Sequence, residues 1–338
     1  MSRATLKDVA ARAGVSYQTV SKVLHGQAQV APETATRIWQ VVHEINYEPN
    51  LSARRLRAGA THLLGYAWHH TPSNLVHPVL DAFLHSAAMA AAEQDYHLFT
   101  FATHDDKAGD VGAYEELYGR HQVDGFILAD TNRGDPRIRF LIEHEIPFAT
   151  FGRANDDWDF CWVDVDGQQG MERVMAHLVA RGHRRIAMIS WPEGSQSGWY
   201  REQGYWNGLQ RAGIAAEAGT IERAENLAPA GAAAMARLLD LPAAQRPTAV
   251  VCVSDLVAIG ALKAVANAGL EVGRDIAITG FDDIPLVEYL RPPLTSVRQP
   301  TLKAGQWVVK MLIQQIEGEP IAHKGILLEP ELVVRQSS

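Results

Sequence analysis

Four polar side chains near the N-terminus have the types and the spacing needed to read base pairs. They are Tyr17, Gln18, Ser21 and Lys22. If this segment is a helix, the four side chains lie together on one face. A glutamine amide suits paired hydrogen bonds to adenine, and a lysine ammonium suits guanine O6 and N7. This face therefore predicts base recognition in the DNA major groove, where Tyr17 would add an apolar or hydroxyl contact.

Two short helices joined by a glycine turn would position this face. Thr5 with Asp8 three residues later has the capping-box form that starts a helix. Gly14 supplies a turn, and Ser16 can cap a second helix. The apolar positions of that helix are Val20, Val23 and Leu24. The pattern predicts a helix-turn-helix whose second helix enters the major groove. The alternative is a small helical hairpin with a solvated polar side.

A third helix and a short arginine-rich segment follow. Pro32 suits the first position of a helix, and Ile38, Val41, Val42 and Ile45 supply its packing stripe. Asn50 can then cap about eight residues that end at Gly59, and a helix so short is marginal alone in water. Its single apolar residue, Leu56, stands among three arginines, which are Arg54, Arg55 and Arg57. A linker would be polar throughout, so this leucine indicates a specific role.

The charge of the chain is unevenly distributed. Residues 1–59 contain eight lysines and arginines but only four acidic residues, a net charge of +4. The whole chain carries −8, so the remainder carries −12. A basic head on an acidic body concentrates the attraction for phosphates in the head.

Length and composition limit the classes of protein that remain. With 338 residues, of which 47% are hydrophobic, the chain can form a small head and two lobes with cores. Its two cysteines, Cys161 and Cys252, provide no disulfide framework or CxxC metal site. The first helix begins too early for a signal peptide, and no apolar run is long enough to span a membrane. We expect a cytoplasmic, nucleoid-associated protein.

From about residue 61, strand and helix patterns alternate. The strands are expected at 63–68, 96–102, 125–129 and 147–151, then at 185–190, 249–253 and 276–280. The helices are expected at 77–94, 113–121 and 137–145, then at 168–181, 201–212, 229–239 and 256–268. Apolar strands that alternate with helices predict parallel sheets covered on both faces. Two such series predict two lobes, with a ligand crevice at the carboxyl ends of the strands.

The sequence resembles the LacI/GalR family of bacterial transcriptional regulators. The N-terminal matches are Thr5-Leu6-x-Asp8-Val9-Ala10-x-x-Ala13-Gly14-Val15-Ser16, Thr19-Val20-Ser21 and Asn46-Tyr47-x-Pro49-Asn50-x-x-Ala53-x-x-Leu56. Later matches are Val163-Asp164-Val165-Asp166-Gly167, Ser254-Asp255 and Ile278-Thr279-Gly280-Phe281-Asp282-Asp283. One departure is Ala31, where the family usually has a serine that caps the third helix.

The resemblance implies a fold and a division into domains. The fold is an all-α helix-turn-helix head plus an α/β two-lobed periplasmic-binding-protein-like core. The head would span residues 1–49, a hinge helix and linker 50–60, and an effector-binding and dimerisation core 61–338. Within the core, lobe one would comprise residues 61–161 and 300–327, and lobe two 162–299 and 328–338. The expected lobe one includes a return helix with the apolar residues Trp307, Val308, Met311, Leu312 and Ile316.

The resemblance also assigns residues to DNA binding. They are Leu6, Ser16, Tyr17, Gln18, Thr19, Ser21, Lys22, His25, Thr34, Tyr47, Asn50, Ala53 and Leu56. Ser16, Thr19, Thr34 and Asn50 would position the head on phosphates. In the family, the hinge helix folds on the operator and its leucine, here Leu56, wedges into the minor groove at the centre of a palindrome. Such an apolar wedge unstacks a base step and bends the duplex.

A second set of residues is expected to bind a small effector between the lobes. The set is Trp68, His69, Trp162, Arg201, Tyr205, Asp255 and Asp282. By resemblance, the charges of Arg201 and Asp282 would grip sugar hydroxyls or a corepressor through charge-assisted hydrogen bonds. The aromatic rings suit the apolar faces of a sugar, although each could instead belong to the core. Where family members often carry a carboxylate after the strand at 147–151, this chain has Gly152-Arg153.

The function predicted from these features is repression of sugar-utilisation genes, relieved by a small carbohydrate. The protein would bind double-stranded operator DNA as a homodimer, since no leucine heptad for a tetramer follows at the C-terminal end. The alternatives are a regulator that responds to a purine or another corepressor, and a two-lobed sugar-binding protein without a regulatory role. No nucleophile elbow, Walker loop or dinucleotide fingerprint predicts an enzyme or a cofactor. His69, His70 and His77 lack the spacing of a helical metal-ligand pair, so no metal is expected.

Overall fold

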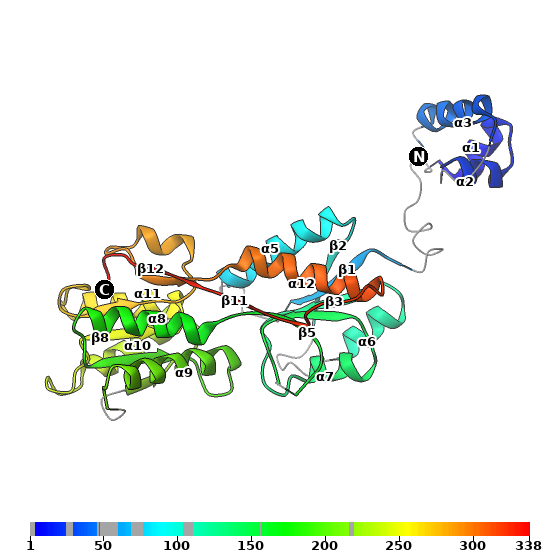
Figure 1. Ribbon diagram of the computed structural model, residues 1–338. Coiled ribbons are helices and arrows are strands. Elements are labelled where there is room, and N and C mark those ends of the chain that lie inside the picture. The colour runs from blue at the N-terminus through cyan, green and yellow to red at the C-terminus, as the bar shows by residue number, and fades with distance from the viewer. Residues whose placement is uncertain are drawn as a thin grey trace. The chain divides into compact units, whose positions relative to one another are not determined.

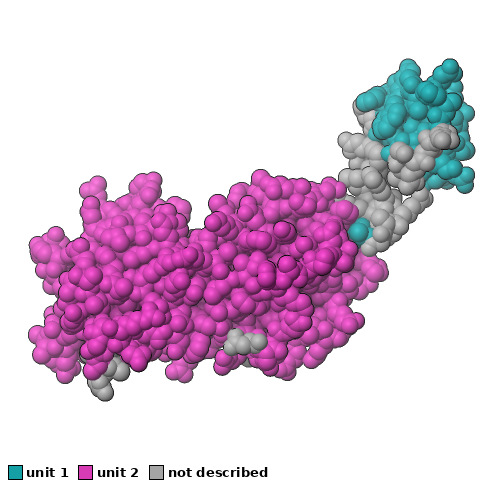
Figure 2. All heavy atoms as spheres, in the orientation of Figure 1, with its two compact units in different colours: residues 1–61 teal, residues 62–338 magenta. Residues whose placement is uncertain are grey.

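The computed structural model describes residues 4–24, 30–45, 47, 60–68, 77–103, 111–155, 157–215 and 220–338. The chain divides into two compact units, residues 1–61 and residues 62–338 (Figure 2). In both units together, no helix of the described ranges has the length and apolar character needed to cross a bilayer.

The first unit contains the predicted helices α1 (Leu6–Ala13), α2 (Tyr17–Leu24) and α3 (Pro32–Glu44). Both arms of the capping box form, because Asp8 N donates to Thr5 Oγ1 at 3.3 Å and Thr5 N donates to the Asp8 carboxylate at 2.8 Å. Gly14 ends α1 with a φ of +66°, a conformation that glycine adopts without a steric penalty. The helices share a small core, whose fully buried members include Val9, Val20 and Ile38.

The caps of the second and third helices differ. Ser16 Oγ accepts a hydrogen bond of 3.1 Å from Thr19 N and so caps α2, as predicted. In contrast, α3 begins after Ala31, which has no side chain that could accept a hydrogen bond. Pro32 occupies the first turn of α3, where its missing N–H costs nothing. The head therefore has the expected helix-turn-helix, with a third helix that lacks an N-terminal side-chain cap.

The second unit contains two parallel sheets (Figure 1). The larger has the strand order β11-β5-β4-β3-β1-β2. Its strands are β1 (Leu63–Trp68), β2 (His97–Ala102), β3 (Gly125–Leu128), β4 (Phe148–Phe151), β5 (Cys161–Val165) and β11 (Gly325–Leu328). Two helices that are distant in sequence, α5 (Pro78–Glu93) and α12 (Thr301–Ile316), pack side by side on one face. The other face packs against α6 (Gly112–Gly119) and α7 (Pro136–Glu143). We call this layered body lobe one.

The smaller sheet has the order β7-β6-β8-β9 and forms lobe two. Its strands are β6 (Ile186–Ser190), β7 (Thr220–Arg223), β8 (Ala249–Cys252) and β9 (Ala277–Thr279). Helix α8 (Gly167–Ala180) packs on α9 (Gln196–Arg211), and α10 (Ala228–Leu239) packs on α11 (Asp255–Asn267). A short 3₁₀ helix, η2 (Pro285–Tyr289), and the antiparallel pair β10 (Ser296–Arg298) and β12 (Glu331–Val333) complete it. The two sheets confirm the α/β core expected from the alternating pattern.

Three described segments connect the lobes, at residues 165–167, 299–301 and 328–331. The lobe boundary expected between residues 161 and 162 does not match the sheets. Strand β5 continues to Val165 and pairs with β4 and β11, so it belongs to lobe one. Strands β5, β7, β10 and β11 were not predicted. Their partners in the sheets are β4 and β11 for β5, β6 for β7, β12 for β10, and β5 for β11.

Candidate effector site and DNA-binding face

Helix α2 presents the predicted reading face. Tyr17, Gln18 and Lys22 are exposed and Ser21 is half-buried, whereas Val20 on the same helix is fully buried against the head. The Ser16 cap fixes the N-terminal end of this face. The Ser16 hydroxyl is also within hydrogen-bond distance of the Thr19 hydroxyl, at 2.8 Å. The helix can therefore approach a duplex with its polar side while its apolar side stays packed.

The remaining predicted DNA-binding residues fall into three groups. Leu6 packs against the head core and Tyr47 is buried in it, so both support the head. Thr34 is half-buried in the first turn of α3. The others lie outside the described residues and are His25, Asn50, Ala53 and Leu56.

A cavity of about 590 Å³ lies between lobe one and lobe two. This volume is within the usual range for small-molecule sites, about 300–1,000 Å³. Lobe one contributes His77, Asp130, Thr131, Asn132, Gly152 and Asp164 to its lining, among others. Lobe two contributes Trp191, Glu193, Ser195, Tyr200, Arg201, Glu225, Asn226, Phe281, Asp282 and Gln299, among others. Many of these residues directly follow strands, as expected for a crevice at the carboxyl ends of parallel strands.

Arg201 lies in the wall of the cavity and is held from three sides. Its Nη1 donates to the carbonyl oxygen of Val253 at 2.5 Å and lies 3.7 Å from Asp282 Oδ1. The guanidinium carbon lies 3.8 Å from the centre of the Phe281 ring and 4.9 Å from that of the Trp191 ring. Burial lowers the pKa of Arg201, while the charges of Asp282 and two other carboxylates raise it. The site therefore fixes a guanidinium in an aromatic, carboxylate-rich setting.

Asp282 faces Arg201 from a loop that follows β9. Its backbone has a φ of +122°, and its N–H donates to the carbonyl oxygen of Val297 at 2.8 Å. The carboxylate accepts a hydrogen bond of 2.6 Å from Gln299 Nε2. Burial raises the pKa of Asp282 to about 6, against the lowering effects of Arg201 and Gln299. The group is thus mainly ionised at neutral pH and stays close to its protonation range.

Lobe one supplies a carboxylate of its own, Asp164 at the end of β5. Its side chain is nearly buried and accepts a hydrogen bond of 2.8 Å from Arg153 Nε. Burial raises the pKa of Asp164, and the Arg153 charge acts in the opposite direction. Although Gly152-Arg153 carries no carboxylate, Arg153 holds Asp164 in the lining, so lobe one still presents a carboxylate to the cavity.

Several buried nitrogen atoms in the lining have no hydrogen-bond partner within the described chain. They are His77 Nε2, Trp191 Nε1 and Arg201 Nε. Buried donors are normally paired, so unpaired ones in a cavity point to a ligand that supplies acceptors. The carboxylates of Asp164 and Asp282 in the same cavity can accept hydrogen bonds. A hydroxyl group both donates and accepts, and the lining therefore suits a hydroxylated ligand.

Six of the seven predicted effector residues are among the described residues, and two of these six, Arg201 and Asp282, belong to the lining. Tyr205 is fully buried beneath β6, where its hydroxyl donates to the Ile186 carbonyl oxygen at 2.7 Å. Trp162 lies on β5 beside Arg153, and Trp68 is 42% exposed at the end of β1, both outside the lining. His69 lies outside the described residues.

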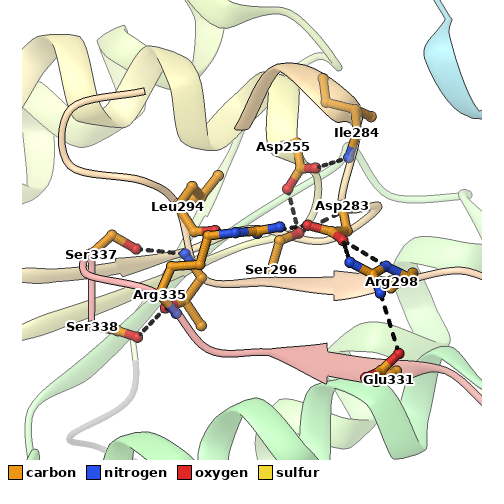
Figure 3. A network of polar contacts seen from close by, with 11 residues as sticks. Asp255, Asp283, Ile284, Leu294, Ser296, Arg298, Glu331, Arg335, Ser337 and Ser338 are labelled. Atoms are coloured by element: carbon orange, nitrogen blue, oxygen red, sulfur yellow. Dashed lines mark hydrogen bonds and ion pairs between the residues drawn. The ribbon is translucent and has the colours of Figure 1, made fainter. Parts of the chain in front are cut away.

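Asp255 is also outside the cavity, because its carboxylate belongs to a buried network (Figure 3). It accepts hydrogen bonds from Ser296 Oγ at 2.5 Å and from Ile284 N at 2.8 Å. Burial and the neighbouring Asp282 charge raise the pKa of Asp255. In the same network, Asp283 pairs with Arg298 and Arg335, each at 2.7 Å. Asp255 therefore holds the loop that carries Asp282 and is not part of the cavity lining.

Sequence reasoning did not propose Trp191 or Tyr200 as effector contacts, although both line the cavity; His77, interpreted as a loop or ligand-contact histidine, lines it as well. One local signal was available for Trp191, which directly follows the predicted strand at 185–190. His77 is the N-cap residue of α5 and Tyr200 lies in the second turn of α9, so which of their side chains reaches a cavity depends on where each helix begins.

Comparison with known proteins finds a matching family model for each of the two units. Residues 5–50 match the model of bacterial regulatory proteins of the lacI family, and residues 175–338 match that of a periplasmic binding protein-like domain. The HTH-type transcriptional regulator CelR of Thermobifida fusca is 33% identical over 99% of this chain and 98% of its own length.

Two solved structures also align with nearly the whole chain. One is the transcriptional regulator CelR in complex with cellobiose, at 30% identity and a TM-score of 0.73, covering 99% of this chain and 100% of that one. The other is the lac repressor dimer bound to operator and the anti-inducer ONPF, at 27% identity and a TM-score of 0.87, covering 99% of each chain.

Proposed function

This chain belongs to the LacI family of bacterial regulatory proteins, and on that premise we propose that it represses sugar-utilisation genes until a small carbohydrate releases it from a palindromic operator. The observation that carries the proposal is the cavity between the lobes. Arg201 and Asp282 face each other there, next to buried N–H groups that have no acceptor among the described residues. The cellobiose complex of the related CelR supports a sugar as the ligand.

The DNA-binding part of the proposal rests on α2. We propose that Gln18 contacts adenine and Lys22 contacts guanine in the major groove of each half-site. Ser16, Thr19 and Thr34 would contact phosphates. From the family resemblance, Asn50, Ala53 and Leu56 would form a hinge helix on the operator, and Leu56 would wedge into the minor groove. The lac repressor dimer on its operator supports two copies of the chain on one palindrome.

Coupling between effector binding and operator binding would follow from the position of the cavity between the lobes. An effector in it would contact both lobes and would favour the lobe arrangement that gives it more contacts. That arrangement would change how the two hinges of a dimer are placed on DNA. Because such coupling is reciprocal, operator binding would weaken inducer binding by the same factor. The protein would act in the cytoplasm, at the nucleoid.

The proposal can be tested with the full-length protein. A binding site is first selected from random duplexes, and its affinity is measured by fluorescence anisotropy at physiological salt. Mono- and disaccharides, and purines as the alternative effector class, are then added to the complex. We expect a palindromic site and release by at least one sugar. Equal affinity for all duplexes would contradict the regulatory role, and a response to purines but not to sugars would replace the inducer with a corepressor.

A further inference from the structure

We propose that the effector is an uncharged polyhydroxy compound, and that the carboxylates around the cavity exclude phosphorylated and acidic sugars. This inference rests on the function proposed above and narrows the class of sugar that the same cavity accepts. Three features of the described lining carry it: its charge balance, the capping of its helix N-termini and the hydrogen bonds that its buried groups lack.

The charge balance of the lining is strongly negative. Five of its residues carry carboxyl groups and a single residue carries a guanidinium group. The five are Asp130, Asp164, Glu193, Glu225 and Asp282. The guanidinium, that of Arg201, already lies 3.7 Å from the Asp282 carboxylate and is also influenced by the charges of Asp164 and Asp255. A second guanidinium, that of Arg153, pairs with Asp164 from beside the lining. An anionic ligand would therefore meet five carboxylates and two guanidinium groups, at short range in a partly buried site.

The N-termini of helices are the other common binding sites for anions in proteins. Four α-helices of the described chain have an N-cap or first-turn residue in this lining, and in three of them, α8, α9 and α11, a side chain already occupies one of the first amides, whereas α5 begins at Pro78 without a side-chain cap. Asp166 Oδ1 accepts from Gln169 N at 2.9 Å in α8, and Ser195 Oγ accepts from Gly198 N at 3.1 Å in α9. In α11, Ser254 Oγ accepts from Val257 N at 3.3 Å. These three helix ends are thus capped from within the chain, and the Asp166 cap adds a further negative charge. At the fourth, the first residue of α5 is Pro78, which has no N–H to offer an anion.

The unmatched hydrogen-bonding groups favour hydroxyls over charged groups. Trp191 Nε1 and Arg201 Nε are buried donors without acceptors among the described residues, and Arg201 is only 6% exposed. A phosphate or carboxylate could accept from them but would leave Asp164 and Asp282 facing a like charge. An ammonium could satisfy these carboxylates but has no acceptor for the Trp191 N–H. A neutral polyol meets both requirements, since each hydroxyl donates once and accepts twice.

Three exposed carboxylates extend this selectivity to the rim. Asp130 lies on lobe one, whereas Glu193 and Glu225 lie on lobe two, so acidic groups from both lobes line the approach. A cleft lined by one sign of charge repels ligands of that sign before they reach the floor. Salt screens exposed charges, so the contribution of the rim should decrease as ionic strength rises.

The test compares matched neutral and anionic sugars on the full-length protein by isothermal titration calorimetry. The probes are cellobiose, maltose, sucrose and trehalose, each with its 6-phosphate, together with glucose, glucose 6-phosphate and glucuronate. We expect the best neutral sugar to bind at least about tenfold more tightly than its phosphate at low salt. Equal or tighter binding of the phosphate would overturn the inference and leave the proposed function intact. Binding of none of these sugars would count against the proposed function itself.

A rim variant tests the role of the carboxylates separately. In Asp130→Asn/Glu193→Gln/Glu225→Gln, we expect the preference for the neutral sugar over its phosphate to narrow several-fold. The control is Glu115→Gln/Glu143→Gln/Glu319→Gln, which removes the same number of charges from exposed positions outside the cavity. An equal narrowing in both variants would show that net charge alone, and not the rim, sets the preference, and would overturn the role assigned to these three residues.

Discussion

The guanidinium carbon of Arg153 lies 3.7 Å from the centre of the Tyr200 ring. Arg153 follows β4 in lobe one and Tyr200 lies on α9 in lobe two, so this stack joins the two lobes beside the cavity. The same guanidinium holds Asp164 in the lining through a hydrogen bond of 2.8 Å. Arg153 therefore links the position of the Asp164 carboxylate in the cavity lining to the distance between the two lobes.

We predict that Tyr200→Leu weakens effector binding, because it removes the face on which Arg153 stacks. A cation–π contact is worth about 0.5–2 kcal/mol, which corresponds to a loss of affinity of about two- to thirtyfold. Tyr200→Phe keeps the ring and should retain most of the affinity. Calorimetric titration with the inducing sugar distinguishes the two variants. If Tyr200→Phe loses as much affinity as Tyr200→Leu, the hydroxyl and not the stack is responsible.

Arg201→Ala should abolish the response to effector while operator affinity is retained. The change leaves the Asp282 carboxylate and the Val253 carbonyl oxygen without their guanidinium partner. Breaking a buried pair in this way costs about 3–5 kcal/mol, so the free energy of unfolding should fall as well. Anisotropy titrations of the operator complex with increasing sugar measure the response.

The matched control for this change is Arg211→Ala, on the same helix. Arg211 pairs with Glu172 at 2.6 Å, but its side chain is 68% exposed. Exposed pairs contribute about 0–1 kcal/mol, so the control should respond to sugar like the parent protein. Release of Arg201→Ala from the operator at ordinary sugar concentrations would contradict the role of Arg201.

Effector affinity should depend on pH through Asp282. Its pKa is raised to about 6 by burial, so the carboxylate becomes protonated as the pH falls through that value. Protonation removes the charge that faces Arg201 and the acceptor that faces the ligand. Affinity should therefore be constant above about pH 7 and should decrease below about pH 6, by at most about tenfold per pH unit.

The effect of Asp282 on the free energy of unfolding has the opposite pH dependence to its effect on effector affinity. Because the pKa of Asp282 in the folded state exceeds its ordinary value of 3.8, the group stabilises the fold at low pH. That contribution is lost as the pH rises through about 6. Asp282→Asn should flatten the affinity profile between about pH 5 and pH 7, measured by calorimetry, and the stability profile between about pH 4 and pH 6, measured by urea unfolding. An unchanged affinity profile in this variant would assign the titration to another group, such as Asp255.

On the DNA side, Gln18→Ala should weaken specific operator binding and relax the base preference at one position of each half-site. A good bidentate contact to a base contributes about 1–3 kcal/mol of discrimination. Gln40→Ala is the control, since Gln40 is exposed on α3 and its amide donates to Glu44 at 3.1 Å. Affinities for the selected site and for single-base variants of it provide the measurement. A uniform loss across all sites would indicate a phosphate contact for Gln18.

The missing cap of α3 gives a prediction about stability. Ala31→Ser should stabilise the head by about 0.5–2 kcal/mol, because a serine hydroxyl can accept a hydrogen bond from the first turn. The same change at Ala11, which is exposed inside α1, should destabilise slightly, since serine is a poorer helix former than alanine. Hydrogen exchange of the α3 amides in the full-length protein measures the effect. Protection equal to that of the parent would show that water already serves as the cap.

The sequence predicted features that depend on local patterns. The capping box of Thr5 and Asp8, the turn at Gly14 and most helices of the core could be read from residues close together in the chain. Strand β11 could not, because it is a half-exposed edge strand whose partner, β5, lies about 160 residues earlier.

The effector site shows the same limit. Arg201 and Tyr205 lie one turn apart on α9, yet one lines the cavity and the other is buried beneath β6. Asp255 and Asp282 both follow strands of lobe two, yet Ser296 and Ile284 N hold the Asp255 carboxylate away from the cavity. The first pair shares a helix and the second shares a residue type and a position after a strand, and in both pairs long-range packing decides which side chain reaches the cavity.

Lobe one takes α12 and β11 from the last part of the chain, after the whole of the lobe-two sheet has been passed. No uninterrupted fragment of the gene therefore encodes this lobe alone. During synthesis, the part of its sheet that α12 covers beside α5 would remain exposed until α12 itself had left the ribosome. The four strands of the smaller sheet emerge earlier, so we expect that part of the molecule to assemble first.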